Sequence, residues 1–341
     1  MTPTVARMVT AKERELVFPL RWYSIPNLFR YEKPQKGRLR EHWQLNVDIF
    51  GIDSNLADIE IVSIAYKIMK NFRAEDSDFE IRINDRNIIK KIYEKFEIND
   101  EDSRKISKII DKKDKISPAS FEEALNEILK DKTDSFVKVI NSSQKVIEFL
   151  GPEDSANITK TIEDLLNVGV KNVVFTPTLV RGFDYYNGIV FEVFDTNPEN
   201  ARSIFGGGRY DNLTQIFGGR DMPAVGFGAG DVTIKDFLLT HNLLPKYIPN
   251  TKIYICTTED SLKDKAIELS SKLRDMGINT AVDYTSKKLG DQIKIADKQK
   301  IPFVICLGED EVKSEVYTIK NLESGEEKKL KLEEISNAVR Q

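Results

Sequence analysis

The sequence predicts a chain of two parts: a mainly antiparallel α+β domain interrupted by a helical block, then a separate α/β domain. Strand-like alternation or strand signals occur on both sides of the helical block, at 42–49, 79–84, 172–180, 188–194 and 224–230. Between Arg86 and about Val168 the apolar spacing is wholly helical. After Asn250 strands and helices alternate, which is typical of a mainly parallel sheet. The helical block is therefore predicted to be an insertion within one sheet domain.

The individual elements have local signals. Apolar residues at helical spacing predict a helix over 54–72 that packs on the sheet. Ser117-Pro118 is typical of a helix start and Gly151-Pro152 of a stop. The last strands form a hairpin that turns at ESGE, 323–326, before a short helix. We expect the domain pieces to be 1–85, 86–168, 169–248 and 251–341.

Composition excludes several classes of protein. Apolar residues make up 40% of the chain and charged residues 31%, as in ordinary globular domains. The net charge of −4 argues against a protein that coats nucleic acid with its whole surface. Two cysteines and two histidines are too few for a structural zinc site, and no residue is assigned to a protein-held metal. No apolar run is long enough to span a membrane and no signal pattern is present, so we expect a cytoplasmic protein.

The stretch FRYEKPQKGRLREHWQLNVDIFG, 29–51, joins a basic loop to an alternating strand. From 42 to 49 the even positions are polar and the odd ones apolar, so one face of the strand is polar. Arg30 lies among aromatic residues, where a guanidinium needs an anion as partner. That anion is either a bound phosphate or carboxylate or the carboxylate of a structural salt bridge.

Two further clusters carry chemistry. LVRGFDYYNGIVFE, 179–192, offers a cation, a carboxylate and two phenols just before a strand, although paired tyrosines are more often packing than recognition. IFGGGRYDNL, 204–213, lacks the ending of a phosphate-binding P-loop and the spacing of a dinucleotide site. Its glycines indicate a backbone that approaches a ligand or another strand closely.

Together these stretches resemble a family. The first is similar to the second motif of class II aminoacyl-tRNA synthetases in its histidyl form. RGFDYYNGIVFE and GGGRYDNL are similar to the two stretches that mark histidyl-tRNA synthetases, and the resemblance extends from Met1 to Gln341. It implies a six-stranded antiparallel catalytic sheet, a helical insertion and a C-terminal anticodon-binding domain. The implied activity is ATP-dependent formation of histidyl-adenylate and transfer of histidine to its tRNA, with Mg²⁺ on the ATP and a homodimeric enzyme.

The resemblance also implies roles for single residues. Arg30 and Arg181 match catalytic arginines on the α-phosphate, and Glu32 and Arg38 match the ATP site. The residues that match the histidine pocket are Thr2, Gln44, Asp48, Tyr186 and Tyr210. An imidazole offers a donor and an acceptor, so a carboxylate and a phenol can recognise both nitrogens. The residues that match the contact to the tRNA acceptor end are Gln35, Lys36 and Arg40.

Two departures from the family pattern stand out. Thr233 occupies the position of an arginine that stacks on adenine in the third motif. The chain also begins after the glutamate that binds the substrate amino group, so we expect it to lack the first motif, a helix and strand of the dimer interface. The alternatives to an active synthetase are a histidine-binding, non-charging regulatory paralogue of ATP phosphoribosyltransferase and an inactive truncated synthetase. The C-terminal domain and the intact basic loop argue against the paralogue.

Overall fold

An eight-stranded sheet organises the first part of the chain in the computed structural model, which describes residues 1–113, 116–180, 185–200 and 202–339. Six strands run antiparallel in the order β1-β3-β8-β7-β6-β4, while β5 adds in parallel beside β4 and the short β2 pairs with β3. The strands are β1 (Leu20–Ser24), β2 (Asn27–Phe29), β3 (Glu41–Phe50), β4 (Phe79–Asp85), β5 (Val173–Phe175), β6 (Ile189–Asp195), β7 (Ser203–Arg209) and β8 (Ala224–Gly230). The expected six-stranded antiparallel sheet is therefore confirmed.

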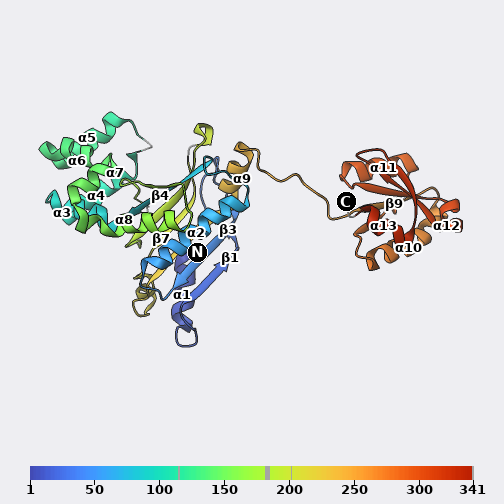
Figure 1. Cartoon of the computed structure of the whole chain (residues 1–341), viewed down its shortest axis with the longest axis horizontal. Coiled ribbons are helices and arrows are strands. Elements are labelled where there is room, and N and C mark those ends of the chain that lie inside the picture. The colour runs from blue at the N-terminus through green and yellow to red at the C-terminus, as the bar shows by residue number, and fades with distance from the viewer. Residues whose placement is uncertain (114–115, 181–184, 201, 340–341) are drawn as a thin grey trace. The chain divides into compact units, whose positions relative to one another are not determined.

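The two faces of this sheet are covered differently. Helix α2 (Asn55–Asn71) begins at Ser54, whose hydroxyl caps the helix, and lies across one face (Figure 1). Leu45, Val47 and Ile49 of β3 pack on this side. Helix α1 (Thr2–Lys12) packs on the other face with an apolar cluster that includes Phe50, Tyr186 and Tyr210. Helix α9 (Asp231–Thr240) follows β8 directly.

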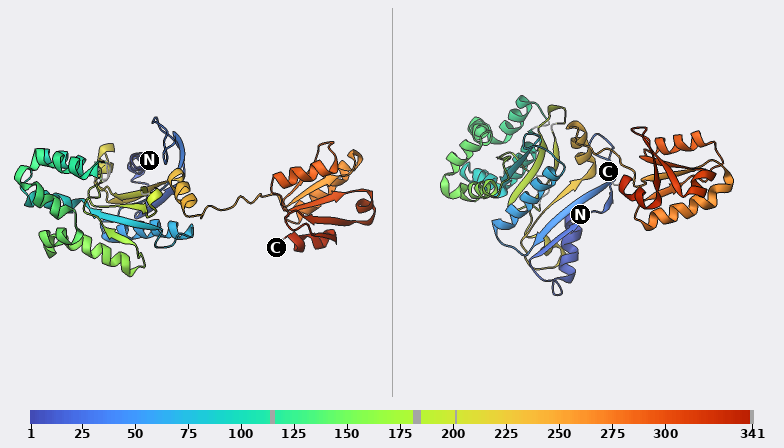
Figure 2. Two further views of the ribbon diagram at one scale, coloured as in Figure 1. Left: turned by 90° about the horizontal axis from the view of Figure 1, so that it is seen from above. Right: turned by 45° about the vertical axis from the view of Figure 1, so that its right-hand side comes forward.

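The helical block forms one body with the sheet core. Its helices are α3 (Arg86–Lys95), α4 (Asp100–Ile110), α5 (Pro118–Leu129), α6 (Thr133–Ile140), α7 (Ser143–Leu150) and α8 (Pro152–Asn167). They gather on the side of the sheet formed by β4 and β5 (Figures 1 and 2). Ser117 caps α5, and Gly151 separates α7 from α8, as the sequence predicts. Asp85 ties the block to the sheet, because it caps α3 and its Oδ2 accepts from Asn157 Nδ2 at 2.7 Å.

The second compact unit comprises residues 245–341, and the first comprises 1–244. Its sheet order is β10-β9-β11-β12-β13, parallel across the first three strands and antiparallel across the last three. The elements are β9 (Ile253–Thr257), α10 (Lys263–Asp275), β10 (Thr280–Val282), α11 (Leu289–Lys298), β11 (Phe303–Leu307), α12 (Glu309–Ser314), β12 (Val316–Asn321), β13 (Glu327–Lys331) and α13 (Leu332–Val339). The predicted α/β rhythm and closing hairpin are confirmed. The finer division of the first unit at residues 85 and 168 stays a prediction.

Among the described residues, no helix combines the length and apolar character needed to cross a membrane.

Candidate active site

The polar face of β3 is buried. Asn46 and Asp48 are each 3% exposed, whereas Trp43 on the opposite face is 52% exposed. Glycines of the neighbouring strand β8 make room for the polar side chains: a Cβ on Gly226 would lie 2.4 Å from Asp48 Oδ1, and one on Gly228 2.5 Å from Gln44 Nε2. A Cβ on Gly226 would also lie 2.5 Å from the Val47 carbonyl oxygen, so position 226 excludes every residue larger than glycine, whereas at Gly228 the nearest atom is the movable end of the Gln44 side chain. The glycine-rich strand and the polar strand thus form one site.

Asp48 lies against two tyrosines that are far from it in sequence. The Tyr210 hydroxyl donates a short hydrogen bond to Asp48 Oδ1, and the rings of Tyr186 and Tyr210 meet edge to face at 6.5 Å between centroids. Burial raises the pKa of Asp48 to about 6, although the Tyr210 hydrogen bond acts to lower it. Burial also raises the pKa of Tyr210, so this phenol stays protonated. The structure therefore brings three of the predicted histidine-pocket residues together.

Gln44 and Thr2 lie beside this group. Gln44 shares the polar face with Asp48, and its Nε2 donates to Asn46 Oδ1 at 2.5 Å. Asn46 Nδ2 in turn donates to the Gln44 backbone carbonyl at 3.0 Å. Thr2 begins α1, whose Val5 packs in the cluster with the tyrosines. Asn46 was not singled out from the sequence, although its even position in the alternation was a usable signal.

The structure corrects one expectation about Arg30. It follows β2, its side chain is 42% exposed, and its Nε forms an ion pair with Glu32. The neighbouring Tyr31 is 98% exposed, so no aromatic core surrounds the guanidinium. Arg38 Nη1 also contacts Glu32, at 3.4 Å from its Oε2. Of the open alternatives, the structure shows the ion pair. Three of the four predicted ATP-site residues are therefore linked, because Arg30 and Arg38 both contact Glu32.

The predicted tRNA-contacting residues lie in the turn that follows. Gln35 and Arg38 close the turn with two backbone hydrogen bonds of 3.0 and 2.9 Å. Lys36 lies at its tip, and Arg40 at its base donates to the Glu32 carbonyl at 3.0 Å. Basic side chains therefore project from a defined turn rather than from an unordered loop.

Arg181 lies outside the described residues, but hydrogen bonds hold the turn at residues 177–179 before it. The buried Asn84 donates from Nδ2 to the carbonyl oxygens of Pro177 and Leu179 at 3.0 and 3.1 Å. The neighbouring Tyr185 contacts Tyr186 at 4.7 Å between ring centroids. Leu179 and Tyr185, described residues on either side of 181–184, both belong to the apolar cluster of Tyr186 and Tyr210.

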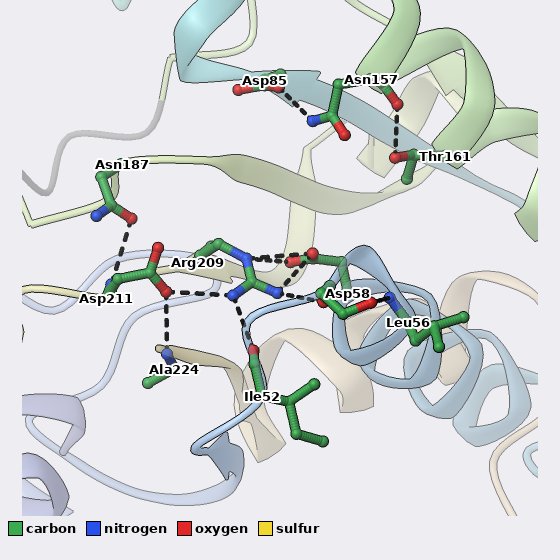
Figure 3. A network of polar contacts seen from close by, with 11 residues as sticks. Ile52, Leu56, Asp58, Asp85, Asn157, Thr161, Asn187, Arg209, Asp211 and Ala224 are labelled. Carbon is green, nitrogen blue, oxygen red and sulfur yellow. Dashed lines mark hydrogen bonds and ion pairs between the residues drawn. The ribbon is translucent and has the colours of Figure 1, made fainter. Parts of the chain in front are cut away.

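Arg209 is a structural residue that sequence analysis missed. It forms a buried ion pair with Asp58 of α2, with Nη2 2.7 Å from Oδ2, and its Nη1 lies 3.2 Å from Asp211 Oδ1 (Figure 3). Burial acts to lower the pKa of Arg209, but the hydrogen bonds of Asp58 raise it above its ordinary value. Asp211 also accepts from the Ala224 amide at 3.0 Å. This network locks β7, β8 and α2 together immediately beside Tyr210.

The third-motif position is occupied by a small side chain. Thr233 Oγ1 donates to the Ile204 carbonyl at 2.6 Å and therefore faces β7. Gly230 is the N-cap residue of α9, and Asp231 Oδ1 accepts from the Trp43 amide at 3.2 Å. The buried His42 lies nearby, and within the described part of the chain its Nδ1 has no hydrogen-bond partner. Like Asn46, His42 lies on the polar face of β3 but was not among the predicted site residues.

Comparisons with known proteins agree with this geometry. A family model described as histidyl-tRNA synthetase matches residues 1–232, and one described as an anticodon binding domain matches residues 252–341. A histidine–tRNA ligase of Leptospira biflexa is 40% identical over 332 residues, covering 95% of this chain and 76% of that protein. One of Haloarcula marismortui is 35% identical over 338 residues, covering 96% and 77%.

The fold is also that of a solved synthetase. The crystal structure of histidyl-tRNA synthetase from Nostoc sp. matches with a TM-score of 0.84 and 24% identity, over 98% of this chain and 81% of that one. With the two family models and the sequence relatives, this shows that the chain belongs to the histidyl-tRNA synthetase family, a family of aminoacyl-tRNA ligases.

Proposed function

We propose that this chain is a histidine–tRNA ligase whose histidine pocket is built on Asp48. In the first step the histidine carboxylate attacks the α-phosphorus of ATP, and the bond to pyrophosphate breaks. In the second, the terminal ribose hydroxyl of the histidine tRNA attacks the carbonyl carbon and AMP leaves. The observation that carries the proposal is the buried Asp48–Tyr210 pair on a polar strand face kept open by glycines.

Selection of histidine follows from the chemistry of an imidazole. One ring nitrogen donates to Asp48, and the hydroxyl of Tyr186 meets the other nitrogen. Gln44 and Thr2 complete the pocket toward the amino-acid backbone. A site whose buried polar groups pair with the substrate rejects analogues without those groups by roughly 10⁴–10⁵-fold. Such a site needs no separate editing reaction.

Activation depends on cations near the α-phosphate. Arg30 and Arg181 stabilise the charge that redistributes when two anions meet. Glu32 and Arg38 hold the nucleotide, and ATP enters as a magnesium complex because its phosphates need a counterion. In the free chain Arg30 and Arg38 both contact Glu32, so ATP binding requires these exposed pairs to rearrange. With Thr233 in place of an arginine, adenine contacts come from other residues.

Transfer depends on RNA contacts from both units. Gln35, Lys36 and Arg40 meet the acceptor end, and residues 251–341 bind the anticodon stem. We further propose a cytoplasmic location, and a homodimer for the full-length member of the family. The domain pieces 1–85, 86–168, 169–248 and 251–341 belong to the same proposal.

Histidine-dependent pyrophosphate exchange tests the proposal. The parent chain should exchange pyrophosphate only with histidine present, and Arg181→Ala should abolish the exchange while leaving the circular dichroism spectrum unchanged. Arg104→Ala, an exposed arginine of α4, is the matched control. If pyrophosphate exchange by Arg181→Ala stays within a few-fold of the parent, the catalytic role proposed for Arg181 is wrong. Histidine binding without exchange or charging would instead favour the regulatory paralogue.

A further inference from the structure

The tip of the basic turn is held by a segment more than 150 residues away. Arg202, in the connection between β6 and β7, donates from Nη1 to the Lys36 carbonyl at 2.7 Å. Lys36 Nζ returns a contact of 3.4 Å to the Glu199 carbonyl in the same connection. Both contacts have backbone carbonyls as acceptors, so they hold the backbone of the turn and of the connection in place.

Gly37 allows this approach. Its φ of +75° lies in the left-handed region, and a Cβ there would be 2.7 Å from Arg202 Nη1. The guanidinium thus occupies the space that a side chain at position 37 would need. The cross-turn hydrogen bonds of Gln35 and Arg38 leave the Lys36 carbonyl free to accept from outside the turn.

The connection that carries Arg202 is itself anchored on a buried carboxylate. Asp195, which is 4% exposed, accepts at Oδ1 from the Asn197 amide and at Oδ2 from Asn200 Nδ2, each at 2.8 Å. His241 Nε2, at the end of α9, lies 2.8 Å from Asp195 Oδ1. Strand β6, through Asp195, and the end of helix α9, through His241, therefore hold the connection that contacts the turn.

We propose that Arg202 is a positioning residue for transfer to tRNA, holding the Gln35–Arg38 turn in the form that the acceptor end meets. The inference rests on the proposed function and assigns to that site a residue outside the basic loop. A turn fixed before RNA binds loses less conformational entropy on binding. A hydrogen bond from a charged donor is strong enough that its loss should raise the KM for tRNA about tenfold. Arg202 contacts the turn at the Lys36 carbonyl and not at the Arg38 side chain, which is proposed to hold the nucleotide, so histidine activation should change by less than twofold.

The first measurement does not depend on catalysis. Amide hydrogen exchange at Gln35 and Arg38 reports whether the turn is closed, because these amides make the cross-turn bonds. Arg202→Ala should speed their exchange at least fivefold, and Arg202→Lys, which keeps a charged donor, should restore much of the protection. Arg21→Ala is the matched control. Arg21 pairs with Glu60 of α2, on the face of the sheet opposite the polar side of β3. Unchanged exchange in Arg202→Ala would overturn the positioning role whatever the enzyme does.

The second measurement is kinetic. For Arg202→Ala we expect the KM for the histidine tRNA to rise about tenfold, pyrophosphate exchange to stay within twofold of the parent, and Arg202→Lys to recover most of the loss. The slope of log KM against log salt should match the parent, because no phosphate contact is lost. A slope reduced by about one would show that Arg202 binds a phosphate itself, and an unchanged KM would show that the turn needs no brace. Either result overturns the inference, whereas a parent without histidine-dependent exchange overturns the proposed function.

Discussion

Strand β3 and the basic loop that precedes it are adjacent in sequence but differ in how they present their polar residues. On β3, Asp48 is 3% exposed and hydrogen-bonded to Tyr210. In the loop, Arg30 is 42% exposed and its partner Glu32 is 25% exposed. The proposed histidine pocket is thus formed by the sheet itself, while Arg30 and Arg38 of the proposed ATP site pair with Glu32 at the surface.

The difference follows from the energetics of burial. A buried carboxylate is retained only if its surroundings satisfy it, so the residues around Asp48 have little freedom. Exposed ion pairs contribute about 0–1 kcal/mol and exchange partners readily. Arg30 and Arg38 can therefore leave Glu32 for a phosphate at little cost. On the proposed assignment, histidine would meet a fixed pocket, whereas ATP and tRNA would meet a loop whose ion pairs can rearrange.

The largest effect should come from breaking the buried network behind the pocket. Asp58→Ala leaves Arg209, whose side chain is 10% exposed, with Asp211 as its one acidic partner among the residues that the structure describes. We expect a loss of about 3 kcal/mol in the free energy of unfolding, since an uncompensated buried charge is costly. Glu60→Ala, on the same helix but in the exposed pair with Arg21, should lose less than about 1 kcal/mol. Urea unfolding of both variants measures the contrast, and equal losses would contradict it.

These regions also differ in what the sequence could predict. Alternation over 42–49 identified the polar face of β3, because a strand's period of two is a local property. The exposure of Arg30 was predicted wrongly, since it depends on where β2 ends and how the loop turns. Arg209 was missed because its partner Asp58 lies 151 positions away, and no local pattern reports such a contact. The sheet and the pocket face were therefore predictable, and the supporting ion pairs were not.

The next effect concerns pH and the buried carboxyl group. The pKa of Asp48 in the fold, about 6, lies above its value of 3.8 in the unfolded chain. The folded chain therefore holds this proton more tightly, and the resulting stability is fully present below about pH 4 and is lost as pH rises through 6. Relative to Asp48→Asn, the parent should lose about 3 kcal/mol of unfolding free energy between pH 4 and pH 8. Other titrating groups are present in both proteins, so their contributions cancel in the difference between the two unfolding free energies. A difference of opposite sign would show that the pKa of Asp48 is not raised by folding.

A smaller effect is expected on substrate selection. Asp48→Asn replaces a charged acceptor by a neutral one, so histidine affinity should fall roughly 30-fold. ATP affinity should change by less than about threefold, because the loop and not β3 holds the nucleotide. Calorimetric titration with each substrate separately measures both constants. If the two affinities fall alike, Asp48 is structural and the histidine pocket lies elsewhere.

The smallest effect should come from the tip of the basic loop. Lys36→Ala removes one exposed ammonium but keeps the backbone carbonyl that Arg202 holds, so the turn should stay closed. The slope of log KM for tRNA against log salt should fall by about one, as expected when one phosphate contact is lost. Pyrophosphate exchange should equal that of the parent. Lys12→Ala, an equally exposed lysine at the end of α1, is the control and should leave the slope unchanged. A Lys36→Ala slope equal to the parent's would place the acceptor end of the tRNA away from this turn, and the loop would then serve ATP alone.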